Sequence, residues 1–315
     1  MLEQRVVTTA AKWGLRQLLR SAKIKQYLGA ELSAGILQLP QIRFAPPGHF
    51  YSPLPDLEEV EAEAERLSRL EVPAAISLNA DEQFRLLTQI LACYPEIPWT
   101  EKPKRGMRYW FGNEYFGWGD AIVLFGMLRH MSSRRVVEVG SGFSSAAMLD
   151  TNELFCGGRI EFTFIEPFPQ RLRQLMNARD VKRVNVIESS VQKVPFSRFE
   201  TLQANDILFI DSSHVSKIGS DVNYLLFEVL PRLNDGVIVH FHDVLYPFEY
   251  PLEWVREGRA WNEVYLLRAF LQYNQTFEVM LFNSYLGHSF RDYVAAIAPL
   301  ITKNFGGSLW LRKKG

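Results

Sequence analysis

The sequence has little of what marks several classes of protein. Only two cysteines, Cys93 and Cys156, occur in 315 residues, too few for a disulfide framework or a cysteine metal cluster. Basic and acidic residues number 35 each, and a net charge of zero argues against non-specific binding to nucleic acid. No uncharged apolar run reaches the roughly 18 residues that span a bilayer. We therefore expect a soluble cytoplasmic protein with no nucleic-acid partner and no membrane span.

The first hundred residues hold no recognisable chemistry. Residues 4–28 contain six basic side chains and no acidic one, with apolar residues at helical spacing. This pattern predicts an amphipathic helix that docks on the domain or in a homodimer interface; the alternative is a surface-binding or targeting helix. Further helices are expected at 57–70 and 81–93.

The stretch at 135–145 organises the rest of the chain. Its three valines are β-branched and nearly continuous, which predicts a strand buried on both faces. Gly140 and Gly142 then permit a sharp turn and the close approach of a ligand to the backbone. Ser144 and Ser145 are expected to cap a following helix. A strand, a glycine turn and a helix N-terminus form the ligand-binding corner of an open α/β sheet.

The sequence of this corner does not match the usual pattern for binding a dinucleotide. The dinucleotide fingerprint G-x-G-x-x-G needs a third glycine, and Ser145 stands there. Glu138 would repel a pyrophosphate but suits an ammonium group or a water molecule. The pattern E-x-G-x-G-x-S resembles motif I of class I S-adenosylmethionine-dependent methyltransferases; the alternative is a plain strand-to-helix turn. The resemblance implies cofactor contacts from Glu138, Gly140, Ser141, Gly142 and Ser144.

The later chain alternates between strand and helix patterns in agreement with that resemblance, with helices expected at 170–179 and 221–233. Strands are expected at 136–140, 159–165, 184–187, 207–210 and 237–241, followed by an antiparallel pair at 277–282 and 308–311. The resemblance implies a Rossmann-like α/β fold with a seven-stranded methyltransferase sheet of order 3-2-1-4-5-7-6. We assign this domain to 105–315 and a helical and loop extension to 1–104.

An acid ends the second predicted strand. Glu166 is placed to accept both hydroxyls of a ribose, a role that nucleotide and adenosylmethionine proteins share. In the family, residues after the third strand frame the adenine, and the segment before the first strand closes over the cofactor. The resemblance therefore implies further cofactor contacts from Asn113, Tyr115, Pro167, Ser190, Val191 and Asp211.

Strands one, four and five should lie side by side, so their carboxyl ends converge. This gathers Asp211, His214, His242 and Asp243 at one rim. Two carboxylates and an imidazole can hold a divalent ion, and His214 could remove a hydroxyl proton during methyl transfer. His240, further down the fifth strand, is expected to be a hydrogen-bonded histidine beneath a helix.

From Asp211 onward the sequence resembles the metal-dependent O-methyltransferases, namely methyltransferase family 24 with the macrolide sugar enzymes and, more remotely, catechol O-methyltransferase. The resemblance implies that Asp211 and His214 are catalytic and that Asp211, His242 and Asp243 bind Mg²⁺ or another divalent metal. His242 departs from the family, which has an acid or amide there. Manganese, iron or no metal therefore stay open.

An aromatic loop at 245–265 follows the fifth strand and predicts a substrate lid; the alternative is aromatic packing between helices. Trp254, Arg259, Trp261 and Asn262 would be its contacts. The leading hypothesis is a small-molecule O-methyltransferase acting on a sugar, phenol, polyketide or lipid-linked glycan, with N-methylation not excluded. The alternatives are a nicotinamide-dependent oxidoreductase and a non-catalytic interaction protein of the same fold.

Overall fold

The computed structural model describes residues 44–67, 69 and 73–315, so the helix expected at 4–28 lies outside the described residues. The chain divides into two compact units. The smaller comprises residues 1–68 and 255–260, and the larger comprises 69–254 and 261–315. Among the described residues, no helix has the length and apolar character to cross a membrane. The predicted division of domains at residue 104 stays a prediction.

In the smaller unit, the acidic segment forms two short helices, α3 (Leu57–Ala62) and α4 (Ala64–Leu67). The Asp56 carboxylate caps α3 by accepting the backbone N–H groups of the following first turn. The single helix predicted over this segment is therefore wrong. Its glutamates lie three and four residues apart, where like charges destabilise a continuous helix.

The larger unit is built on a seven-stranded sheet of order β3-β2-β1-β4-β5-β7-β6, which confirms the predicted order. The first five strands are parallel, and β7 is antiparallel to both of its neighbours. The strands are β1 (Arg135–Val139), β2 (Glu161–Ile165), β3 (Asn185–Ile187), β4 (Ile207–Ile210), β5 (Ile238–Phe241), β6 (Phe277–Phe282) and β7 (Leu309–Lys313). The boundaries of all but β4 and β6 differ by one or two residues from those expected.

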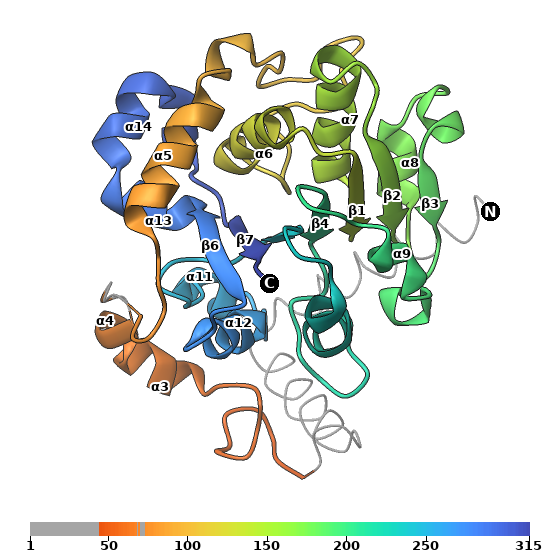
Figure 1. Cartoon of the computed structure of the whole chain (residues 1–315). Helices are drawn as coiled ribbons and strands as arrows, with labels where there is room; N and C mark the ends of the chain where they lie inside the picture. Colours follow the sequence, from red (N-terminus) through yellow and green to blue (C-terminus); the bar gives the residue numbers. More distant parts are fainter. Residues whose placement is uncertain (1–43, 68, 70–72) are drawn as a thin grey trace, which may run out of the picture. The chain divides into compact units, whose positions relative to one another are not determined.

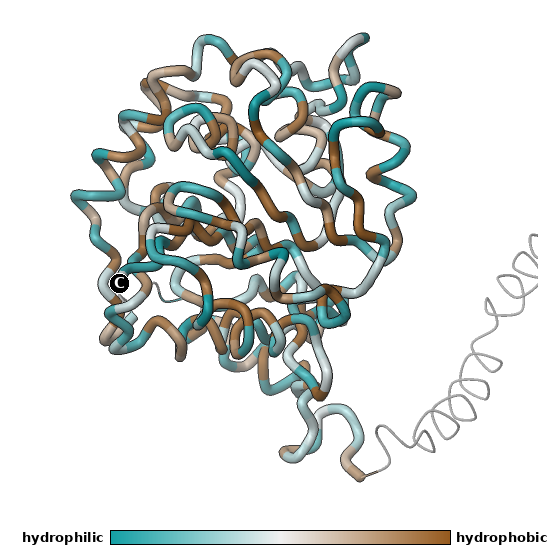
Figure 2. Tube along the Cα trace, turned by 45° about the vertical axis from the view of Figure 1, so that its right-hand side comes forward, coloured by the Kyte–Doolittle hydropathy of each residue, from teal (hydrophilic) through white to brown (hydrophobic). Residues whose placement is uncertain are grey.

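Alternate residues of each strand enter two separate cores, as the two-residue period requires. Val136 belongs to one core and Val137 to the other. The strands are largely brown in Figure 2, since both faces of the sheet are covered. The first core includes α5 (Ala80–Leu91), α6 (Trp118–Met131), α7 (Phe143–Phe155), α8 (Gln170–Leu175), α13 (Asn283–Ser289) and α14 (Arg291–Ile297); the second includes α9 (Ser197–Glu200), α10 (Asp221–Tyr224) and α12 (Glu263–Leu271).

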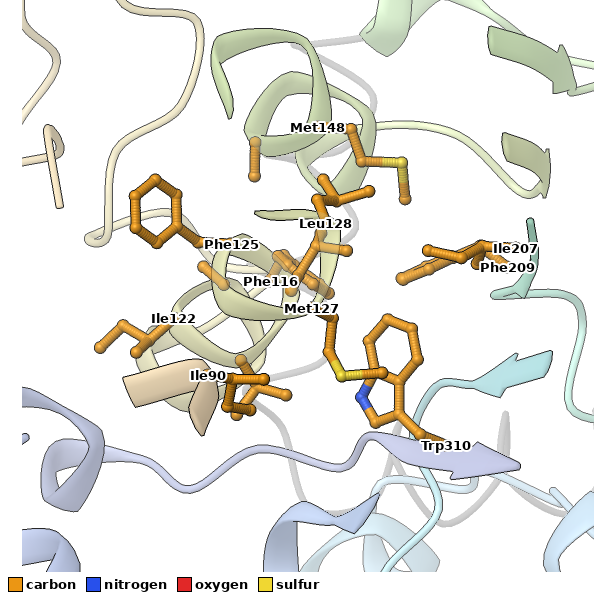
Figure 3. Close-up of a cluster of buried hydrophobic side chains, with 14 of the residues drawn as sticks. Ile90, Phe116, Ile122, Phe125, Met127, Leu128, Met148, Ile207, Phe209 and Trp310 are labelled. Atoms are coloured by element: carbon orange, nitrogen blue, oxygen red, sulfur yellow. The ribbon is translucent and has the colours of Figure 1, made fainter. Parts of the chain in front are cut away.

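Helix α6 is apolar all round, because it lies between the sheet and other helices. In Figure 3 its Phe125 and Met127 point into the first core, where Met127 lies beside Trp310 of β7. This packing places the start of α6, and the aromatic loop before it, over the carboxyl ends of the central strands: Phe116 of that loop lies 5.2 Å from the ring of His242.

Strand β6 lies at an edge of the sheet, and side chains near α5 cover part of that edge. Asn79 Nδ2 donates to the carbonyl of Val279, and Gln83 Oε1 accepts from the N–H of Phe282. Gln83 is fully buried. Because a bare edge invites pairing with another chain, these contacts stabilise the end of the sheet.

Two predicted helices differ from what the structure shows. The helix expected over 221–233 is α10, a π turn (Leu225–Val229) and a 3₁₀ turn (Leu230–Arg232) in succession. Pro231 cannot donate to the preceding turn, which explains the irregular end. The helix expected over 170–179 ends at Leu175, because Asn177 Oδ1 accepts the N–H groups of Arg179 and Asp180 and builds a local turn.

Candidate active site

The carboxyl ends of β1, β4 and β5 meet at one edge of the sheet, as predicted. Val139 pairs with Ile210, and Ile210 pairs with Phe241. The backbone continues the pairing beyond the strands, since Asp211 N donates to Val139 O and His242 N donates to Ile210 O. The residue that follows each strand therefore faces the same rim.

The two glycines of the turn have different constraints. Gly140 has φ 81°, and a Cβ there would lie 1.7 Å from the carbonyl oxygen of Asp211. Gly142 has an extended φ of 178°, and its Cβ would meet only the flexible Arg171 side chain, at 3.2 Å from Cδ. The fold therefore requires glycine at position 140. At position 142 there is room beside the backbone, and only the Arg171 side chain lies next to it.

Glu138 is a buried acid beneath the turn. Its carboxylate accepts from the hydroxyl of Ser144 at 2.5 Å and from that of Ser145. Burial raises the pKa of Glu138 to about 8. Helix α7 begins at Phe143 with Gly142 as its cap residue, so the predicted capping is wrong for Ser144, whereas Ser145 takes part in the capping through the N–H of Gly142. Both serines lie in the first turn of the helix.

The acid after β2 contacts the same turn. Glu166 Oε2 accepts the N–H of Ser141 at 3.1 Å, and Oε1 accepts the N–H of Phe168 at 2.8 Å. Pro167 beside it is exposed. The structure thus brings together the glycine turn and the predicted ribose acid, the two parts that a nucleoside would bridge.

The remaining predicted cofactor residues have distinct positions. Val191 is buried in the second core, and Ser190 before it is half-buried. The Asn113 amide is engaged within its own loop, donating to two carbonyls and accepting two N–H groups. The Tyr115 ring is half-exposed, with the Arg171 guanidinium 3.7 Å from its centre. Their contacts with a cofactor stay predictions.

His214 is surrounded by acidic side chains. Its Nε2 lies 3.4 Å from Asp211 Oδ1 and 3.7 Å from Asp243 Oδ2, and its Nδ1 lies 2.9 Å from Glu263 Oε2. Burial alone would lower the pKa of the imidazole, but Asp211 and Glu263 outweigh it and raise the pKa to about 10. The Trp261 ring centre is 4.4 Å from that of His214.

The two histidines of β5 are in different surroundings. His242 Nε2 lies 3.7 Å from Asp243 Oδ1, and its pKa is raised because nearby carboxylates outweigh its burial. His240 stacks on Phe209 at 3.6 Å and its Nε2 bonds to Ser308 Oγ. Burial holds the pKa of His240 well below its ordinary value. This confirms His240 as a hydrogen-bonded core histidine.

The side chains at this rim do not form a metal site as they are placed. Within residues 44–67, 69 and 73–315, no group of three or more His, Cys, Asp or Glu side chains is arranged to hold a metal ion. The carboxylates of Asp211 and Asp243 face His214 Nε2 instead of a common open position. An ion at Asp211, His242 and Asp243 stays a prediction.

Several buried polar atoms at the rim lack a hydrogen-bond partner. They are Ser141 Oγ after β1, Ser212 Oγ after β4, His242 Nδ1 after β5 and Glu263 Oε1. Buried polar groups are usually hydrogen-bonded, so these atoms are available to a polar ligand or to water. The turn around Gly140 and these donors and acceptors fit a polar nucleoside-type ligand.

Two residues of the site were not predicted from the sequence. Arg171 borders the glycine turn and contributes to lowering the pKa of Asp211. Glu263 begins α12 and bonds to His214. An acid in the first turn of a helix is common, so nothing in the local sequence distinguished Glu263. Asn262 bonds through its side chain to the backbone of Ser216, and its contact with substrate stays a prediction.

The sheet order, the glycine turn and the acid after β2 define an α/β protein of the methyltransferase topology. A family model described as a methyltransferase domain matches residues 137–244, which contain the rim residues from Glu138 to Asp243. An uncharacterized protein of Archaeoglobus fulgidus is 36% identical over 170 residues, which are 51% of this chain and 75% of that protein.

Solved structures with a similar fold include the SAH-bound methyltransferase PaMTH1 of Podospora anserina, at 16% identity and a TM-score of 0.40 over 82% of this chain and 95% of that chain. The O-methyltransferase TomG of Streptomyces achromogenes, in complex with SAM, has 12% identity and a TM-score of 0.40 over 73% and 90%. Residues 137–244 therefore form a methyltransferase domain, and the sheet that holds them has the strand order expected for a class I S-adenosylmethionine-dependent methyltransferase.

Proposed function

We propose that the chain transfers the methyl group of S-adenosylmethionine to a hydroxyl oxygen of a small molecule, with His214 as the general base. The observation that carries this proposal is the position of His214 at the shared rim of β1, β4 and β5. Its Nε2 faces the carboxylates after β4 and β5, and the glycine turn after β1 lies beside them.

The cofactor would lie across the glycine turn. Glu166 would accept the ribose hydroxyls, and the Gly140–Gly142 turn would admit the amino-acid tail. Ser141 Oγ and Ser212 Oγ, both buried and without partners, would hydrogen-bond to it. The remaining predicted contacts are Asn113, Tyr115, Glu138, Ser144, Pro167, Ser190, Val191 and Asp211.

The reaction requires a base and no acid. The substrate oxygen attacks the methyl carbon, an O–C bond forms and the S–C bond breaks. The methyl donor would be released as S-adenosylhomocysteine, a neutral thioether, and His214 Nε2 would accept the hydroxyl proton. The carboxylates around His214 raise its pKa to about 10 and favour its protonated form, so the rate of methyl transfer should rise with pH as the imidazole loses its proton.

Aromatic rings flank the proposed base on the substrate side. Trp261 lies against His214, and Trp254 and Tyr250 lie 5.3 and 6.0 Å from Trp261. Rings of this kind suit the flat face of a sugar or a phenol. Both acceptor classes place a hydroxyl at the edge of the ring, where His214 Nε2 could accept its proton.

A direct test is calorimetric titration of the chain with S-adenosylmethionine and, separately, with NAD. We expect binding of the methyl donor and none of NAD, because Ser145 stands at the position of the third glycine and is bonded to Glu138. NAD binding without adenosylmethionine binding would refute the proposal and favour an oxidoreductase. Release of S-adenosylhomocysteine with catechol or a methyl glucoside as acceptor would then establish turnover.

We also propose that residues 1–104 form an extension to a methyltransferase domain at 105–315, and that its amino-terminal helix docks on the domain or forms a homodimer interface. The basic, amphipathic composition of 4–28 supports this arrangement. Removal of residues 1–28 should change the oligomeric state in solution, or leave a monomer less stable to heat.

A further inference from the structure

The beginning of α12 fixes the segment that carries His214. The backbone N–H groups of Asn262 and Glu263 both donate to the carbonyl oxygen of His214, at 3.0 and 3.2 Å. The Asn262 amide accepts from Ser216 N at 2.6 Å and donates to Ser216 O at 3.3 Å. His214 itself has φ 58°, a left-handed conformation that a residue with a side chain rarely adopts. These bonds stabilise that unusual backbone.

The side chain of Glu263 also contacts His214, in addition to its backbone N–H. It is 1% exposed, and its Oε2 lies 2.9 Å from His214 Nδ1. Its other oxygen, Oε1, is buried without a hydrogen-bond partner. A buried carboxylate with one oxygen unpaired costs stability. The burial of both side chains shields their contact from solvent.

The two ring nitrogens of His214 face different groups. Nδ1 faces only the buried Glu263 carboxylate, and Nε2 faces Asp211 and Asp243 at the rim. An ionised carboxylate can only accept, so when Glu263 is ionised the Nδ1 nitrogen carries the proton of this bond. In the neutral imidazole the lone pair then lies on Nε2, the nitrogen at the rim.

We propose that Glu263 is a positioning residue that holds His214 in the Nδ1–H form and aims Nε2 at the acceptor hydroxyl. This inference rests on the proposed function, because it assigns a partner to the proposed base. Glu263 does not touch substrate or cofactor; it acts through His214, in the way that a carboxylate orients the histidine of a catalytic triad.

The informative variant is Glu263→Gln, which keeps the shape of the side chain. Its amide can donate to Nδ1, which would move the imidazole proton to Nε2 and remove the lone pair that the base needs. We expect kcat for release of S-adenosylhomocysteine, with catechol or a methyl glucoside as the probe acceptor, to fall by roughly 10²–10⁴-fold. KM and the affinity for adenosylmethionine should stay within about twofold, since a base acts on the chemical step.

Glu263→Asp is the second variant. It keeps the carboxylate but withdraws it by one methylene, so kcat should lie between those of wild type and Glu263→Gln. The matched control is Glu278→Gln. Glu278 lies in β6 and its carboxylate pairs with Lys314, so this variant also loses an ion pair but should leave kcat unchanged. A purely structural ion pair predicts lower stability in both Glu263 variants and an unchanged kcat in the folded fraction, which would overturn the proposal.

A measurement without an acceptor tests the orientation itself. In ¹⁵N-histidine-labelled full chain, the proton on His214 Nδ1 should be detected, protected from exchange, and assigned by its loss in His214→Ala. The same resonance should be lost in Glu263→Gln; its persistence there would refute the role of Glu263. If His214→Ala keeps full turnover, the proposed base is wrong; if only Glu263→Gln keeps it, the base stands and the positioning role fails.

Discussion

The two glycines of the turn after β1 should respond differently to the same substitution. In Gly140→Ala, the new Cβ would lie 1.7 Å from the carbonyl oxygen of Asp211, a backbone atom that can move only by separating the ends of β1 and β4. Alanine at φ 81° adds strain of about 1–2 kcal/mol, and forcing extra volume into a packed site adds about 1–3 kcal/mol. We expect a loss of about 2–5 kcal/mol in the free energy of unfolding.

Gly142→Ala should leave the fold nearly intact. The φ angle of 178° lies outside the left-handed region, and the new Cβ would meet only Arg171 Cδ at 3.2 Å, in a flexible side chain that can give way. The cost should stay below about 1 kcal/mol. The same methyl group would project where the cofactor approaches the turn, so affinity for adenosylmethionine should fall at least about tenfold while the protein stays folded.

Urea unfolding of both variants and calorimetric titration of Gly142→Ala with adenosylmethionine test this contrast. Equal stabilities of Gly140→Ala and wild type would refute the close approach of β1 and β4. Unchanged affinity in Gly142→Ala would refute the placement of the cofactor at the turn, whatever the stabilities.

Three further predictions concern charge and surface. Burial raises the pKa of Glu138 from 4.5 to about 8, so between these pH values the Glu138 carboxyl is ionised in the unfolded chain and protonated in the folded chain. The free energy of unfolding should therefore fall by up to about 1.4 kcal/mol per pH unit as the pH rises through this window. Urea titrations of Glu138→Gln should no longer show that decline. Because His214 faces Asp211 and Asp243, Mg²⁺ or Mn²⁺ should bind more tightly to His214→Ala than to wild type in calorimetry, and tighter binding to wild type would instead support the metal site expected from the sequence. The full chain should remain in the supernatant with anionic liposomes at physiological salt, and cosedimentation would show that the basic amino-terminal segment binds membranes.

The sheet was predictable because its signals are local. β-branched runs mark the buried strands, and the topology follows from their alternation with helices. The rim was predictable for the same reason: Asp211 and His242 each follow a strand directly, so the order of the strands alone brings them together.

The contacts between side chains were not predictable in the same way. Glu263 lies 49 residues beyond His214 in the sequence, and their bond depends on the packing of α12 against the segment after β4. The sequence predicted Ser144 and Ser145 as helix caps, but the hydroxyls of both serines donate to the buried carboxylate of Glu138. The sequence pattern suited a metal site, yet the carboxylates face an imidazole, which only the rotamers of the folded chain determine.

The most direct test of the central claim compares His214→Ala with wild type in two measurements. Calorimetry should give the same affinity for adenosylmethionine, because His214 is not among the proposed cofactor contacts. The rate of S-adenosylhomocysteine release with the acceptor that wild type uses should fall by roughly 10²–10⁴-fold. A variant that binds the cofactor and turns over at the wild-type rate would contradict His214 as the base of this methyl transfer.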